Sequence, residues 1–70
     1  MRLYPVESEM LRLVGYDPGL EVLEVVFNTG DRYQYKEVPA AEFARLMNAE
    51  SIGQYMHRHI IDRYDYERLN

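Results

Sequence analysis

The chain has 70 residues, eight Lys and Arg against twelve Asp and Glu, a formal net charge of −4 and no cysteine. This length predicts one domain over residues 1–70 with a small core, and the missing cysteine excludes disulfides, thiolate metal sites and cysteine nucleophiles. The acidic balance opposes phosphate binding by bulk charge, and no apolar run is long enough for a membrane span or signal peptide, so we expect a cytoplasmic protein that contacts no membrane and binds nucleic acid only through a local basic patch.

Three segments rich in Val, Leu and aromatic residues predict a three-stranded antiparallel meander over residues 10–16, 20–27 and 31–37. Asp17-Pro18-Gly19 is a turn sequence in which proline presets φ and glycine accepts a positive φ. Asn28-Thr29-Gly30 fits a three-residue hairpin loop, a type I turn followed by glycine in the left-handed conformation. The second segment is therefore the predicted central strand.

The two loops fix a predicted register, because directly opposed residues of an antiparallel pair share a face. We place Tyr16 and Leu20 on either side of the first loop. Phe27 and Asp31 then flank the second. The predicted core face carries the large apolar side chains of Leu11, Leu13, Leu23, Val25, Phe27, Tyr33 and Tyr35. The predicted outer face combines an apolar strip with three cations, namely Met10, Val14, Val22 and Val26 with Arg12, Arg32 and Lys36.

Two amphipathic helices are predicted after Pro39. Residues 40–48 place Phe43, Leu46 and Met47 at helical spacing, with Glu42 in the first turn, where the helix dipole favours an acid. A capping box at Ser51 to Gln54 starts the second helix. Its inward stripe is Ile52, Tyr55, Met56, His59, Ile60 and Arg63. Both helices cover the apolar face, which gives a two-layer α+β fold in β-β-β-α-α order.

Several short motifs occur in an order and spacing that resemble one known family. They are Gly15-Tyr16-Asp17, alternating Leu23, Val25 and Phe27, then Gly30, Tyr33-Gln34-Tyr35, Val38-Pro39, and Ala49 with Ser51, Gly53 and Tyr55. From about Val6 to Tyr64 the pattern resembles the KTSC domain, which is named for the C-terminus of some lysyl-tRNA synthetases and also occurs as short stand-alone bacterial and phage proteins. Its activity is unknown. The resemblance implies the same fold, and the association with tRNA synthetases implies RNA as a partner.

Two positions depart from the family pattern. The family often has asparagine where His57 stands, and arginine where this chain has Ile61. Tyr33 and Tyr35 form the central Tyr-x-Tyr motif and would stack bases if exposed. Our register places both rings on the core face, so we interpret them as structural.

No catalytic, metal or cofactor site is predicted. His57 and His59 lie two apart on a predicted helix, so their side chains diverge by about 200° and do not chelate one ion. His59 falls on the apolar stripe, as a core or boundary histidine, and His57 is expected in solvent. The hydroxyls of Ser8, Thr29 and Ser51 lie in no nucleophile-elbow sequence, and Ser51 has the capping role.

The run 57–70 interleaves arginine with tyrosine, a combination that protein interfaces and RNA sites both use. The candidate binding residues are Arg58, Arg63, Tyr64 and Arg68, together with Arg12, Arg32 and Lys36 of the predicted strands. A solvated helix face is the alternative, because Asp62 and Glu67 lie close enough to neutralise these arginines and Arg58 pairs with Asp62 at i, i+4.

The sequence therefore predicts a non-catalytic interaction module with structured RNA, tRNA-like RNA in particular, as its leading partner. The alternative is a module that binds a host protein domain or self-associates as a weak homodimer through the outer apolar strip, since monomers usually cover such patches. The salt dependence of binding distinguishes these two hypotheses, because phosphate contacts lose affinity steeply as the salt concentration rises, whereas an apolar strip does not.

Overall fold

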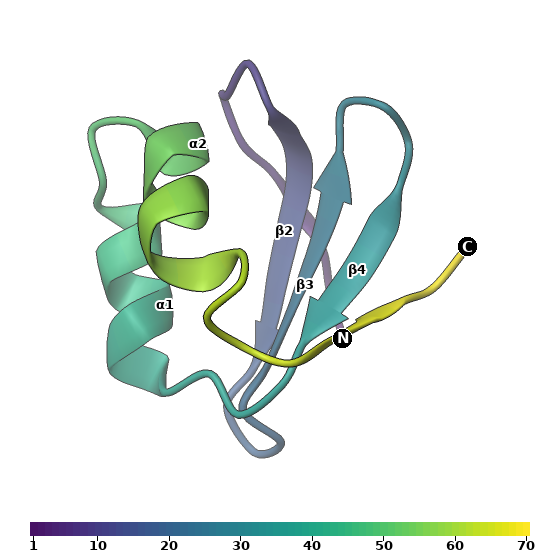
Figure 1. Ribbon diagram of the computed structural model, residues 1–70, viewed down its shortest axis with the longest axis vertical. Coiled ribbons are helices and arrows are strands. Elements are labelled where there is room, and N and C mark those ends of the chain that lie inside the picture. The colour runs from purple at the N-terminus through teal and green to yellow at the C-terminus, as the bar shows by residue number, and fades with distance from the viewer.

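The computed structural model describes all 70 residues and shows one antiparallel sheet with helices on one face (Figure 1). The strands, in spatial order, are β1 (Tyr4–Pro5), β2 (Leu11–Asp17), β3 (Val22–Phe27), β4 (Arg32–Tyr35) and β5 (Tyr66–Arg68). The helices are α1 (Ala40–Met47) and α2 (Ile52–Tyr55), which continues into a π-helical turn (Met56–Ile60). The α+β class and the three central strands agree with the prediction. The sheet has five strands rather than three, because a short strand pairs with each edge of the meander.

The second hairpin forms as predicted. Gly30 has φ of 95°, and its amide donates to the Phe27 carbonyl at 2.9 Å, which closes the three-residue loop. Tyr33 lies opposite Val25 and Tyr35 opposite Leu23. The register of β3 and β4 is therefore confirmed.

The first hairpin has a different register from the predicted one. Asp17 belongs to β2, and its carboxylate Oδ1 accepts the amides of Gly19 (2.9 Å) and Leu20 (3.1 Å). Glu21 takes a left-handed φ of 54°, so the loop has four residues, Pro18 to Glu21. Val14 consequently lies opposite Val25. This shift by an odd number of residues moves the side chains of β2 to the other face.

A β-bulge at Arg12 then reverses the shift at the start of β2. The pairing changes from Leu13 with Val26 to Leu11 with Phe27, which leaves Arg12 as the extra residue. The prediction was wrong for Leu13, which is only partly buried, and for Val14, which belongs to the core. The buried core consists of Leu11, Val14, Leu23, Val25, Tyr35, Val38, Leu46, Met56 and Ile60.

The N-terminal segment crosses β2 so closely that only glycine fits at position 15. A Cβ at Gly15 would lie 2.5 Å from the Arg2 carbonyl oxygen and 2.7 Å from Leu3 Cδ2. We expect Gly15→Ala to displace this segment and to cost about 1 to 3 kcal/mol, the usual cost of overpacking. Urea unfolding measures the loss, and hydrogen exchange should show weakened protection at the pairing of β1 with β2.

Gly19→Ala is the matched control, because Gly19 is exposed and the nearest atom to an added Cβ is the flexible Asp17 carboxylate, at 3.3 Å. We expect it to unfold within about 0.5 kcal/mol of the parent. Equal stability and equal β1 protection in both variants would contradict the close contact at Gly15.

The first helix agrees with the prediction to within one residue, whereas the second differs from it at the C-terminal end. Ser51 Oγ accepts the Gln54 amide at 3.2 Å, the serine half of the predicted capping box. The helix then widens, because the Ile61 amide donates to the carbonyl of Met56, five residues earlier, at 2.7 Å. It ends at Ile60 rather than continuing to Arg63.

This ending changes the placement of three polar side chains. The π-helical turn buries Met56 and Ile60, and His59 is exposed rather than part of the core, with its ring 4.4 Å from that of Tyr55. Asp62 takes a left-handed φ of 65°, so the predicted i, i+4 ion pair with Arg58 does not form.

Candidate functional site

The predicted cations divide into those paired with acids and those that are free. Arg32 contacts Glu24 at 2.8 Å, Lys36 contacts Glu67 at 3.7 Å, and Arg68 contacts Asp31 at 2.8 Å. The remaining ion pair joins Arg45 to Glu42. Three of the predicted binding residues have no acid within 4.0 Å and are exposed: Arg12, Arg58 and Arg63.

Arg32 is held within the outer face of the sheet. Glu24, only 6% exposed, accepts hydrogen bonds from Arg32 (2.8 Å) and from Gln34 Nε2 (3.0 Å). Burial alone would raise the pKa of Glu24, but the hydrogen bonds from Arg32 and Gln34 outweigh it and lower the pKa. Arg12 lies two strands away, on β2.

The apolar strip predicted on the outer face does not form. Val14 is 2% exposed and belongs to the core, which follows from the shifted register. Met10 packs against the core from the loop before β2 and approaches Gly53 of α2. Val26 lies opposite Arg32 as predicted, but it is only 3% exposed. We therefore do not retain this face as a docking strip.

The two tyrosines of the Tyr-x-Tyr motif have different surroundings. Tyr35 is 2% exposed in the core, and burial raises its pKa to about 12. Tyr33 is partly buried, and its ring stacks on that of Tyr66 with centroids 5.4 Å apart and planes at 20°. Tyr35 thus lies on the core face where the register placed it, whereas Tyr33 contacts Tyr66, which is 57% exposed.

A buried carboxylate that was not predicted joins the helices to the C-terminal segment. Glu42, 9% exposed, accepts hydrogen bonds from Tyr55 Oη (2.7 Å), Arg45 (3.0 Å) and Tyr64 Oη (3.3 Å). Burial alone would raise the pKa of Glu42, but these donors and the charge of Arg45 lower it. The signal in the sequence was that Glu42 lies four residues before Leu46, on the inward face of α1.

The hydroxyl of Tyr64 thus donates its hydrogen bond to Glu42 within the fold. Burial, followed by the charge of Glu42, raises the pKa of Tyr64. We call five exposed residues of the segment 57–66 the C-terminal surface: His57, Arg58, His59, Arg63 and Tyr66.

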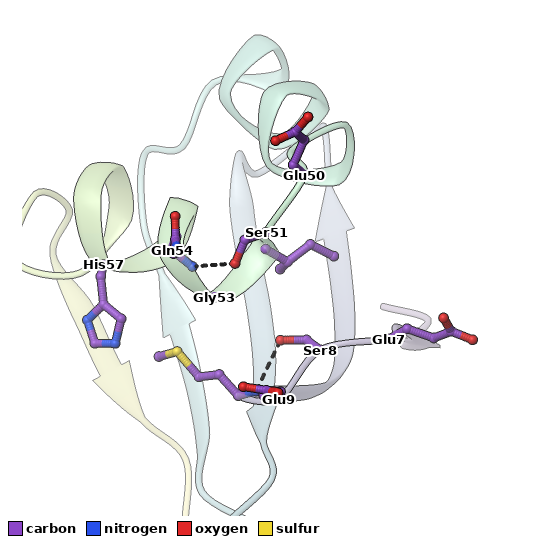
Figure 2. A pocket seen from close by; sticks show the side chains of 10 residues that line it. Glu7, Ser8, Glu9, Glu50, Ser51, Gly53, Gln54 and His57 are labelled. Atoms are coloured by element: carbon purple, nitrogen blue, oxygen red, sulfur yellow. Dashed lines mark hydrogen bonds between the residues drawn. The ribbon is translucent and has the colours of Figure 1, made fainter.

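Figure 2 shows an open groove between the N-terminal loop and the start of α2. It has a volume of about 470 Å³ and includes Glu7, Glu9 and Glu50. Ser8 Oγ accepts the amides of Met10 (3.1 Å) and Leu11 (3.2 Å). Ser51 has its capping role at the same groove. The three acids disfavour an anionic ligand here.

A second open depression, which we call the C-terminal hollow, has a volume of about 420 Å³. Its walls are the five consecutive residues Asp62, Arg63, Tyr64, Asp65 and Tyr66. Arg58 and His59 line a separate hollow of about 250 Å³ next to α2. No three His, Asp or Glu side chains converge as metal ligands, and no helix is long and apolar enough to cross a membrane.

The fold and this surface define a small two-layer α+β domain that exposes two unpaired arginines, Arg58 and Arg63, and the ring of Tyr66 near its C-terminal end. The model of the KTSC domain family matches residues 7–64, and the chain therefore belongs to the KTSC domain family.

Its relatives include stand-alone proteins and parts of larger ones. An uncharacterized protein from Stutzerimonas stutzeri is 36% identical over 58 residues, which cover 83% of this chain and 82% of that protein. A lysine–tRNA ligase from Nostoc is 34% identical over 64 residues, or 91% of this chain but only 11% of the ligase. The crystal structure of a KTSC domain protein from Yersinia pestis superposes with a TM-score of 0.95 at 29% identity, covering 99% of this chain and 97% of that one.

Proposed function

We propose that the chain is a small non-catalytic interaction module that binds structured RNA, tRNA-like RNA in particular, through the C-terminal surface. The observation that carries the proposal is that Arg58 and Arg63 are exposed and free of acids within 4.0 Å, whereas Arg32, Lys36 and Arg68 are paired. Free guanidinium groups bind phosphate oxygens without first breaking an ion pair.

The relatives support RNA as the partner. Lysine–tRNA ligases from Nostoc and from Trichormus variabilis contain a segment similar to 91% of this chain. A domain that is part of an enzyme acting on tRNA lies near tRNA whenever the enzyme binds it. The absence of cysteine agrees with a reducing compartment, and we place the module in the cytoplasm.

The charges around the two arginines set the expected mode of binding. Asp62 and Asp65 alternate with Arg58 and Arg63 along the chain, and the net charge is −4. The net charge of the protein therefore opposes the approach of RNA, and a few direct contacts to phosphate carry the affinity. Such contacts give salt-dependent binding, with a slope of log K against log salt of about −0.7 to −0.9 for each phosphate neutralised.

Amide chemical-shift titration of the labelled protein with a tRNA-sized RNA, at low and at physiological salt, tests this proposal. We expect salt-sensitive shifts centred on residues 57–66. Replacing Arg58 and Arg63 together by serine should weaken binding and reduce the salt slope by roughly one for each lost phosphate contact.

Arg2→Ser with Arg12→Ser is the matched comparison, because it removes the same charge from two arginines that also lack ion pairs but do not belong to the C-terminal surface, and it decides whether the candidate Arg12 takes part in binding. It should bind RNA like the parent. An equal loss in both double variants would mean that net charge alone acts. If RNA causes no shifts while dilution of the free protein does, the chain is a self-associating module instead.

A further inference from the structure

Tyr66 is the exposed end of a row of aromatic rings that crosses three strands. Phe27 meets Tyr33 edge to face at 5.5 Å, and Tyr33 stacks on Tyr66 at 5.4 Å. Because β5 is the edge strand (Figure 1), no strand lies beyond Tyr66. Tyr66 is 57% exposed. The Tyr66 ring therefore packs against the rings of Tyr33 and Tyr35 of β4, while more than half of the residue is in contact with solvent. One more flat aromatic group could continue the stack.

The C-terminal hollow adjoins this ring. Its volume of about 420 Å³ falls in the range of about 300 to 1,000 Å³ typical of small-ligand sites. Arg63 also lines it and has no acid within 4.0 Å. The hollow thus combines a stacking surface with a free cation, the two groups that recognise a base and its phosphate.

The backbone holds these side chains in place. The amides of Arg63 (3.1 Å) and Tyr64 (3.3 Å) both donate to the Ile60 carbonyl, which fixes the turn after the helix. Tyr64 is bonded to Glu42, and the Asp65 carbonyl accepts the amide of Lys36 at 2.8 Å. The hollow is therefore preorganised at both ends, which lowers the entropy cost of binding.

The two acids of the hollow distinguish between bases. Asp62 and Asp65 form no ion pair, and an ionised carboxylate only accepts hydrogen bonds. Guanine offers neighbouring N–H donors on its Watson–Crick edge, which a carboxylate accepts two at a time. Uracil offers one donor between two carbonyl oxygens, which a carboxylate repels.

We propose that the C-terminal hollow binds one unpaired nucleotide of an RNA strand, with its base stacked on Tyr66 and its phosphate on Arg63, and that guanine binds there more tightly than uracil. This inference rests on the proposed function and names the part of the RNA that the C-terminal surface recognises. Loops and bulges of structured RNA supply such unpaired bases.

Fluorescence anisotropy at low salt tests the proposal with three labelled RNAs: a hairpin with a guanine in its loop, the same hairpin with uracil at that position, and a fully paired duplex. We expect the guanine hairpin to bind most tightly and the duplex most weakly. Tyr66→Ala should weaken binding of the guanine hairpin by about five- to 150-fold, which corresponds to about 1 to 3 kcal/mol of base–aromatic stacking.

Two variants separate stacking from other effects. Tyr66→Phe keeps the ring and should bind like the parent. Tyr4→Ala removes a tyrosine of similar exposure, 55%, from the opposite edge strand and should also bind like the parent. In the unmutated protein, the Tyr66 ring protons should move upfield on addition of the hairpin, a readout that does not depend on how Tyr66→Ala folds.

The possible failures are distinguishable. If the hairpins bind but Tyr66→Ala binds as tightly as Tyr66→Phe, and the ring protons do not move, the hollow is not the nucleotide site while the proposed function stands. If no RNA binds at low salt, both proposals are overturned. If the protein binds a peptide along the edge of β5 and does not respond to RNA, both proposals are overturned in favour of strand addition.

Discussion

Tyr35→Ala should unfold at far lower urea concentration than the parent, with a loss of about 3 to 5 kcal/mol. The ring is 2% exposed, lies opposite Leu23 in the sheet, and belongs to the core of nine buried residues. A chain of 70 residues has a total stability on the order of 3.5 to 10 kcal/mol, so this loss removes a large part of it. Equilibrium denaturation followed by far-UV circular dichroism measures the change.

Two further variants identify the ring as the cause. The Tyr35 hydroxyl donates no hydrogen bond within the protein, so Tyr35→Phe should keep nearly all of the stability. Tyr4→Ala, at a 55% exposed tyrosine, should cost less than about 0.5 kcal/mol. If Tyr35→Ala melted like Tyr4→Ala, Tyr35 would not be a core residue and its role in the motif would have to be functional.

The sequence was most informative where local chemistry permits a single geometry. Asn28-Thr29-Gly30 requires a left-handed glycine, and this requirement fixed the pairing of β3 with β4. The first loop was ambiguous. Asp17 can belong to the turn or end the strand, and its carboxylate satisfies the loop amides from the strand position. The bulge at Arg12 has no signal of its own, because it compensates for a shift made elsewhere.

The C-terminal strand was missed for a related reason. Residues 57–64 continue a helical spacing, and no glycine or proline marks the end of the helix. The helix ends through the π-helical turn and the left-handed backbone of Asp62, both of which depend on tertiary packing. β5 has only three exposed residues and gains its stability from pairing with β4.

The candidate site was predicted in part. Arg58 and Arg63 were candidate binding residues from the sequence, and the structure leaves both exposed and free of ion pairs. Tyr66 was not a candidate, because its importance depends on lying at the sheet edge beside Tyr33. Strand order, which sequence spacing does not reveal, therefore decided which tyrosine is exposed.

Glu42→Ala should cost about 2 to 4 kcal/mol, a large effect for an acid in the first turn of a helix. The substitution removes the acceptor shared by Tyr55, Tyr64 and Arg45, and it leaves two partly buried tyrosine hydroxyls without their partner. Arg45 contributes little of this energy, because its side chain is 60% exposed and solvent screens its charge.

Glu50→Ala is the matched control, since Glu50 is exposed and forms no ion pair. This substitution should leave the free energy of unfolding nearly unchanged. Equal costs for both substitutions would show that the network carries no net stability.

The pH dependence of unfolding separates the charge of Glu42 from its packing. The pKa of Glu42 is lowered in the folded chain, so the unfolded chain binds more protons as the pH falls below the ordinary value of about 4.3. The stabilisation is thus complete above that value and is lost as the pH falls through the lowered pKa.

Glu42→Gln should unfold more easily at neutral pH and lose less stability on acidification than the parent. The pKa of Glu24 is also lowered, so the Glu42→Gln variant should keep the loss of stability in acid that Glu24 causes. Glu24→Gln should remove that part of the loss. A Glu42→Gln variant with the same acid-induced loss as the parent would mean that Glu42 is not the carboxylate that couples the helices to the C-terminal turn.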